Sequence, residues 1–282
     1  MTEESSFKYR TDIHLPKKPL VEAWLELRWR TADTVPLDPI LPPVGPVDSN
    51  SQLAPGIFYE RVRGRYGIHE PLPTAQIPVE LTPHQVAHRF RQIGSPYPLL
   101  QLGPGVASVN FVQEYSWTAF RGEALYLRKN LLDAYRQHDL VLLDVILRYR
   151  DLFGFDFRGE DVVKFLSDKL HIGLSWPTSI PGHVAAKPFP TSVGLNLGFE
   201  LQTPPAVGSV RVATAINTTE SGVVRPVILA EFEVRAREVT SDLLLDEERF
   251  TTWMDNAHAA VHDWFFSLID GDLFQEFNTG GL

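Results

Sequence analysis

Four segments of the chain alternate apolar and polar side chains with a period of two, and this pattern constrains the fold more than any other feature. The alternation covers residues 21–29, 143–149, 193–201 and 228–237. It is typical of strands that bury one face and expose the other. A further segment, 210–216, is expected to pair with 228–237 as an antiparallel hairpin across the polar turn at 217–222.

Helical periodicity is confined to other parts of the chain. Residues 117–137 and 246–269 carry apolar side chains every three or four positions, which predicts two long amphipathic helices. A shorter helix is predicted at 82–93, with Thr82 as its N-cap and Pro83 as its first residue, and another at 160–171. Together the segments predict an α+β fold: antiparallel sheet from two similar halves, each with a long amphipathic helix packed on one face.

The order of the predicted elements repeats along the chain. Strand 20–31, helix 82–93, strands within 98–116 and helix 117–137 are followed by strand 140–151, helix 160–171, strands within 191–238 and helix 246–269. The motif Leu-Arg-Trp-Arg at 27–30 also matches Leu-Arg-Tyr-Arg at 147–150. We therefore predict an N-terminal half, 1–138, and a C-terminal half, 139–282, related by internal duplication. The alternative that the two form one continuous domain stays open.

Proline-rich segments interrupt both halves. Residues 32–58 contain six prolines and two glycines, a composition that predicts a long surface loop, and a second such segment spans 177–190. Loops of this length often contact ligands or partners. Both segments are therefore candidate contact surfaces.

Composition excludes several classes of site. The chain has no cysteine, which excludes disulfides, thiolate metal sites and a cysteine nucleophile, and favours a cytoplasmic location. No segment has the pattern of a signal peptide or a membrane span, so no membrane association is expected. The net charge of −9 argues against general nucleic-acid binding. Residues 1–130 carry 14 basic and 13 acidic residues, so the acidic excess belongs to the second half.

Short motifs spread over nearly the whole chain carry a family resemblance. They are Leu15-Pro16-Lys17-Lys18-Pro19-Leu20-Val21-Glu22-Ala23, Tyr97-Pro98-Leu99-Leu100-Gln101-Leu102-Gly103-Pro104-Gly105, Val109-Asn110, Tyr115-Ser116-Trp117, Leu147-Arg148-Tyr149 and Ala257-His258 with Phe265 or Phe266. With them the chain resembles a sporadically distributed, uncharacterised bacterial protein family, a TIGR family. The resemblance implies a cytoplasmic bacterial accessory protein, of the kind encoded on mobile islands or in defence loci, and supplies no site residue. Asp151 stands where this family usually has Asn.

Two histidine pairs have the i, i+4 spacing that can hold a zinc ion on one helix face. His84 and His88 form the first pair, but Gln85 replaces the Glu that a zinc protease needs as its general base. His258 and His262 form the second, with Asp255 one turn earlier, and these three residues are the candidate metal ligands. The alternative is that the two histidines lie at the border of the apolar stripe and bond to loop backbone or to acids.

Arginines on the two matching strands form the other candidate site. Arg28 and Arg30 on one strand, and Arg148 and Arg150 on the other, project from the same faces as Glu22, Glu26 and Asp144. If the strands are neighbours, these side chains form a ladder of cross-strand ion pairs. The alternative is a patch that binds an anion or a carboxylate, with Tyr149 beside it.

A smaller basic segment is the one local candidate for nucleic-acid contact. Arg61, Arg63 and Arg65 alternate along a predicted strand, with Tyr59 and Tyr66 at its ends. Such arginines also occur as a solvated strand edge that prevents aggregation. The chain contains no phosphate-binding loop, dinucleotide fingerprint, nucleophile elbow or calcium loop.

Three classes of function remain open. The first, which we favour, is a noncatalytic binding or assembly protein, an accessory component of a defence or mobile-element system with a protein partner or a second copy of itself. The second is a metal-dependent hydrolase or nuclease using the His and Asp residues of the last helix. The third is a ligand-binding module with an apolar pocket between the sheet and a long helix. No cofactor is expected, and the chain lacks a complete catalytic motif.

Overall fold

A computed structural model describes residues 15–32, 48, 50–112, 114–135, 140–156, 159–175, 190–218, 222–237 and 241–279. Its strands are β1 Leu20–Thr31, β2 Ile68–Pro71, β3 His88–Gln92, β4 Ser95–Gly103, β5 Val106–Phe111, β6 Leu140–Gly154, β7 Gly194–Leu201, β8 Ala206–Thr218 and β9 Val224–Ala236. Its α-helices are α1 Ala54–Val62, α2 Trp117–Ala134, α3 Val162–Leu170, α4 Ser241–Leu245, α5 Glu247–Ile269 and α6 Asp272–Asn278, and two short 3-10 helices span Pro73–Gln76 and Val79–Leu81.

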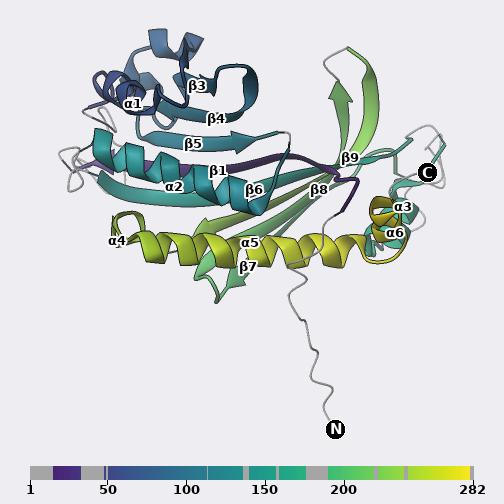
Figure 1. The fold of residues 1–282 in the computed structure, drawn as a ribbon. Helices are drawn as coiled ribbons and strands as arrows, with labels where there is room; N and C mark the ends of the chain where they lie inside the picture. The colour runs from purple at the N-terminus through teal and green to yellow at the C-terminus, as the bar shows by residue number, and fades with distance from the viewer. Residues whose placement is uncertain are drawn as a thin grey trace.

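All nine strands belong to one antiparallel sheet in the order β2-β3-β4-β5-β1-β6-β9-β8-β7. The strands predicted for the two halves thus form one continuous layer, with β1 and β6 paired at its centre. Helices α2 and α5 lie side by side across one face, and α3 and α6 lie near the C-terminal end of α5 (Figure 1). The α+β fold predicted from the alternation is confirmed.

Strand order is similar on the two sides of the β1–β6 pair, with β5, β4, β3 and β2 beyond β1 and β9, β8 and β7 beyond β6. On each side the central strand is followed in the chain by a helix, an antiparallel meander of strands and a long helix, α2 or α5. The predicted hairpin is also present, with Val210 opposite Phe232 and Val212 opposite Ala230. The predicted internal duplication is not shown by this arrangement and stays a prediction.

The buried face of the sheet and the two long helices enclose one continuous apolar core. Alternate residues of β1, namely Ala23, Leu25, Leu27 and Trp29, are fully buried against it. Asp246 caps α5 by accepting hydrogen bonds from the backbone N–H groups of Glu248 and Arg249, at 2.9 and 3.1 Å. The cap fixes where α5 begins, and hence which of its residues face the sheet.

Several local predictions were wrong, and the first concerns the helix expected at 82–93. Residues 82–93 do not form a helix: His84 has a positive φ of 56°, and β3 follows as a strand between β2 and β4. The alternation of buried Phe90 with the less buried Arg89 and Arg91 suits a strand, and Ile93, expected in the helix stripe, is 81% exposed. Gly94, with a φ of +82°, closes the turn into β4.

The second error concerns the proline-rich segment at 32–58. Its last five residues belong to α1, and Pro55 stands in the first turn, where its missing N–H costs nothing. Residues 33–47 and 49, and residues 176–189 of the second proline-rich segment, lie outside the described residues. No helix among the described residues is long and apolar enough to cross a membrane.

Candidate functional site

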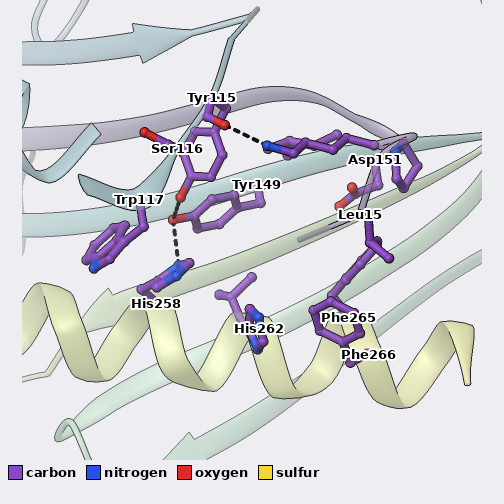
Figure 2. A pocket seen from close by; sticks show the side chains of 14 residues that line it. Leu15, Tyr115, Ser116, Trp117, Tyr149, Asp151, His258, His262, Phe265 and Phe266 are labelled. Atoms are coloured by element: carbon purple, nitrogen blue, oxygen red, sulfur yellow. Dashed lines mark hydrogen bonds between the residues drawn. The ribbon is translucent and has the colours of Figure 1, made fainter. Parts of the chain in front are cut away.

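A cavity of about 290 Å³ lies between the central strands and helix α5, near the start of β1 (Figure 2). Aromatic and aliphatic side chains make most of its wall, and its size is at the lower end of small-molecule pockets. The lining residues are Leu15, Lys18, Pro19, Leu20, Tyr115, Ser116, Trp117, Tyr149, Asp151, His258, Val261, His262, Phe265 and Phe266.

Simple periodicities bring these residues together. On β6, Tyr149 and Asp151 continue the face that Val145 and Leu147 bury, because every second residue of a strand points the same way. On α5, the lining residues recur at 258, 261, 262, 265 and 266, which is the spacing of one helix face. The first turn of α2 and the segment that precedes it close one side with Tyr115, Ser116 and Trp117.

A bulge at the start of β1 shapes the opposite wall. Leu20 pairs with Asp151 and Glu22 with Arg150, so Val21 is an extra residue in β1. The bulge places Leu20, and not Val21, in the cavity wall. The alternation in the sequence had assigned Val21 to the buried face, and the extra residue changes that assignment.

The segment before β1 crosses the cavity and is held at several points. The backbone N–H of Leu152 donates to the Pro19 carbonyl at 3.0 Å, and that of Lys17 donates to the Phe277 carbonyl at 3.2 Å. The Lys18 ammonium donates to the Tyr115 carbonyl at 2.9 Å. The cavity is therefore bounded by parts of the chain that are far apart in sequence.

Three side chains form a hydrogen-bonded chain along the cavity. The hydroxyls of Tyr115 and Tyr149 lie 2.7 Å apart, and the Tyr149 hydroxyl lies 3.0 Å from Nδ1 of His258 (Figure 2). The His258 ring stacks on Trp117 with centroids 4.0 Å apart and planes at 9°. A neutral imidazole can accept the Tyr149 proton at Nδ1, which leaves Tyr149 free to accept from Tyr115.

Burial keeps this chain uncharged near neutral pH. It lowers the pKa of His258 to about 3, and the nearby ring of His262 acts in the same direction. Burial raises the pKa of both Tyr115 and Tyr149 above the ordinary value for a phenol. The three groups therefore act as hydrogen-bonding dipoles and carry no charge into the cavity.

Asp151 differs from these three hydrogen-bonded groups of the cavity. Its side chain is buried, with the residue only 3% exposed. Burial raises the pKa of its carboxyl group to about 8. Among the described residues no hydrogen bond to this carboxyl is found, and no cationic side chain lies within the 4.0 Å of an ion pair. An unpartnered carboxyl in an aromatic cavity is unusual, because buried polar groups normally find a partner.

The predicted metal ligands do not converge on one point. Asp255 accepts a hydrogen bond from the Trp117 indole at 3.2 Å and pairs with Arg121 at 3.1 Å, while His258 bonds to Tyr149. In the part of the chain that the structure describes, no group of three His, Asp or Glu side chains is arranged to hold a metal ion. The spacing of Asp255, His258 and His262 was thus misleading: the two histidines line the cavity, and Nδ1 of His262 is buried without a partner among the described atoms.

The four candidate arginines lie on the strands predicted for them, on the opposite face of the sheet from the cavity. Arg150 pairs with Glu22 of β1 at 2.8 Å and with Glu231 of β9 at 2.9 Å. The expected cross-strand ion pairs therefore exist, although β9 supplies part of them: Arg148 bonds to Glu233, while Arg28 pairs within β1 with Glu26 at 2.5 Å.

Tyr149 projects to the other face from its neighbours Arg148 and Arg150, so the grouping of these residues as one patch was wrong. Arg30 also lies on β1 and is half-buried. The side chains of Arg148 and Arg150 lie 4.7 and 5.1 Å from the centre of the Trp24 ring. These arginines are thus held within the sheet, and a role in binding an anion stays a prediction.

The basic segment at 61–65 is not a strand, because α1 ends at Val62 and a turn follows. Arg61 pairs with Asp133, Arg63 with Glu60 and Arg65 with the buried Glu123. The spacing of His84 and His88 was equally uninformative, since Nδ1 of His84 lies 2.9 Å from the Gly105 carbonyl and His88 contacts His69.

The central residue of the cavity was missed as a candidate, although the sequence carries a signal for it. Asp151 stands at the inward position of a strand whose other inward residues, such as Leu147 and Phe153, are apolar. A charged residue at a position that the pattern assigns to the core is rare and points to a functional role. The contributions of Tyr115 and Trp117 have no such signal, because only the tertiary fold brings them to β6.

A second cavity, of about 660 Å³, lies near α3 and α6. Two of its charged groups are engaged with the protein, since Asp161 caps α3 and Lys169 pairs with Asp272 at 2.8 Å, and Lys164, Asp168 and Glu276 are exposed. It holds no buried unpartnered group comparable with Asp151 among the described residues. The smaller cavity is therefore the better candidate site.

Comparison with protein-family models, with curated proteins and with solved structures gives no match for this chain.

Proposed function

We propose that this protein binds a small organic molecule in the cavity between β6 and α5. The observation that carries the proposal is the carboxyl group of Asp151, which is buried in an aromatic cavity and has no hydrogen-bond or ion-pair partner among the described residues. Burying a polar group without a partner is costly, and ligand sites are where proteins place such groups. The few polar groups of the cavity among mainly apolar walls also match the usual composition of small-molecule sites.

The remaining polar groups suit a preformed binding site. Tyr115, Tyr149 and His258 satisfy one another, so their positions are fixed before a ligand arrives. A site whose walls are ordered in advance loses less conformational entropy on binding. Among the described lining residues, the carboxyl of Asp151 is then available to a ligand, and Nδ1 of His262 also lacks a partner.

The other functions predicted from the sequence have less support from the geometry. A hydrolase or nuclease would use Asp255, His258 and His262, and these side chains bond to different partners. An accessory role in a defence or mobile-element system, with a protein partner or a second copy of the chain, stays a prediction, as does the cytoplasmic location.

Native mass spectrometry tests the proposal. We expect the purified protein to retain a small molecule, or to acquire one from a bacterial metabolite extract, that is released on denaturation. Val261→Phe and Leu20→Trp add bulk to opposite walls of the cavity and should abolish this binding. Ser267→Phe, at an exposed position on the same helix, is the matched control and should bind normally.

Two outcomes would contradict the proposal that the cavity binds a ligand. If no molecule is retained or acquired, or if both bulky variants bind as well as the wild type, the cavity is not a ligand site.

A further inference from the structure

We infer, building on the proposed function, that the ligand is an organic cation, a protonated primary or secondary amine on a compact apolar body, whose ammonium group donates hydrogen bonds to Asp151.

The charge that the Asp151 carboxyl can carry is the first reason to expect a cationic ligand. The carboxyl of Asp151 lines the cavity. Lys18, the one cationic side chain among the described residues of that wall, donates to the Tyr115 carbonyl and is not within ion-pair distance of Asp151. A carboxylate that lacks a counter-ion in a cavity of low dielectric constant attracts a cation strongly. A second anion in the same cavity would be repelled by it. A carboxylate also accepts hydrogen bonds only, so it favours a ligand that carries N–H donors.

The aromatic walls of the cavity are the second reason to expect a cationic ligand. Tyr115, Trp117, Tyr149, Phe265 and Phe266 line the same cavity as the carboxyl with aromatic rings. The faces of such rings carry partial negative charge and attract ammonium groups, so an aromatic cavity with one carboxylate is a favourable site for an amine. Leu15, Leu20 and Val261 complete the wall and suit an apolar body of modest size.

Among the described titratable groups that line the cavity, we expect the carboxyl of Asp151 to titrate near neutral pH. Lys18 comes from the segment before β1, Tyr115 from the segment before α2, Tyr149 from β6, and His258 and His262 from α5. Burial raises the pKa of both tyrosines and lowers the pKa of both histidines, so these four stay neutral. With a pKa of about 8, Asp151 is mainly protonated at neutral pH in the empty site. An amine must therefore displace its proton.

Matched probes test the inference by isothermal titration calorimetry. The panel consists of amine, alcohol and carboxylate forms of the same phenyl, cyclohexyl and indolyl bodies, for example 2-phenylethylamine, 2-phenylethanol and phenylacetate. We expect the best amine to bind at least about tenfold more tightly than its alcohol, and the carboxylate to bind most weakly. The affinity for the amine should rise about tenfold per pH unit up to about pH 8 and then level off, with proton release on binding.

Variants distinguish the contribution of the Asp151 carboxyl to amine binding from that of the rest of the cavity. Asp151→Asn keeps the shape of the side chain and should lose at least about tenfold in affinity for the amine, together with its pH dependence, while the alcohol binds unchanged. Asp144→Asn, on the opposite face of the same strand, is the control and should behave as the wild type.

Two results would overturn the inference. If an alcohol or carboxylate binds as tightly as its amine, or if Asp151→Asn retains the affinity for the amine, the ligand is not a cation, and the proposed ligand site remains. If no member of the panel binds and native mass spectrometry also finds no ligand, both this inference and the proposed ligand-binding function are wrong.

Discussion

Asp151 shows how one residue sets the chemistry of a site. It occupies an inward position on a central strand, where Leu147 and Phe153 on the same face are buried in the core. Apolar residues there would serve the stability of the fold better, because an unpartnered carboxyl disfavours its charged form and raises its own pKa. The residue therefore reduces stability in exchange for a polar group inside the cavity.

Stability should depend on pH through this carboxyl. Its pKa is near 3.8 in the unfolded chain and about 8 in the folded protein, so between these values the folded protein binds more protons. The free energy of unfolding must then fall as the pH rises. Relative to Asp151→Asn, we expect the wild type to lose on the order of 3 kcal/mol between about pH 5 and about pH 8.

Urea unfolding at both pH values measures this difference. The titration of His258 affects both proteins alike and cancels in the comparison. Parallel pH profiles for the two proteins would show that Asp151 is not the buried titrating group.

The hydroxyl of Tyr149 connects two other side chains. Its removal should therefore lower the free energy of unfolding more than removal of the Tyr115 hydroxyl does. Tyr149→Phe leaves both the Tyr115 hydroxyl and Nδ1 of His258 without their partner, whereas Tyr115→Phe leaves only one contact unmade. We expect losses in the free energy of unfolding of about 2 kcal/mol for Tyr149→Phe and about 1 kcal/mol for Tyr115→Phe. Denaturant unfolding distinguishes them, and equal losses would argue against a continuous hydrogen-bonded chain.

At the scale of elements, close packing of α5 on the sheet positions the cavity residues. Trp264 of α5 lies over Gly208 of β8 and against Phe199 of β7, with the two aromatic rings 5.4 Å apart. A glycine at 208 allows this approach, because a Cβ atom there would lie 2.3 Å from Cη2 of the indole. The neighbouring turns of the helix carry His262 and Phe265, so a shift of α5 would also change the cavity.

Gly208→Ala should therefore destabilise the protein and weaken ligand binding together. We expect a loss of about 1–3 kcal/mol in the free energy of unfolding, from overpacking between β8 and α5. Gly198→Ala on β7 is the matched control, because a Cβ there would meet nothing within 4 Å, and it should be neutral or slightly stabilising. If the two variants had equal stability, the contact between Gly208 and Trp264 would not determine the position of α5 on the sheet.

In two strands, β3 and β6, the periodicity of the sequence predicts the wrong local structure. The helix expected at 82–93 depended on an N-cap signal and on Val86, Phe90 and Ile93, whereas β3 forms because β2 and β4 bond to it on both sides. Leu143, expected on the buried face of β6, is 39% exposed because it is an extra residue opposite β1 between Asp144 and Leu142. Hydrogen bonding between strands outweighs a local pattern in both cases.

At the scale of the whole molecule, the two sequence halves share one sheet and one core. Strands β1 and β6 pair along most of their lengths, and the buried apolar side chains of both halves form a single cluster. The cavity likewise takes Leu20 and Tyr115 from the first half and Asp151 and His258 from the second. Neither half could form the site alone.

We therefore expect the protein to unfold in one cooperative transition. Labelling with 5-fluorotryptophan gives a separate ¹⁹F resonance for each of the six tryptophans, among them Trp29 and Trp117 in the first half and Trp253 and Trp264 in the second. Trp24, Trp29, Trp117, Trp253 and Trp264, the five in the described part of the chain, should lose their native resonances at the same urea concentration. Two transitions divided between the halves would show that they are independent domains.

What the sequence determined by itself is most strands of the sheet, though not β2 and β3, and the two long helices, because periods of two and of 3.6 follow from local backbone geometry. It also determined which faces of β1, β6 and α5 are buried, apart from the two bulges. The tertiary structure alone decided that β1 and β6 are neighbours, that Tyr149 and His258 bond, and that Asp151 faces a cavity. Those contacts join residues more than a hundred positions apart or depend on a one-residue bulge, and no local pattern records either.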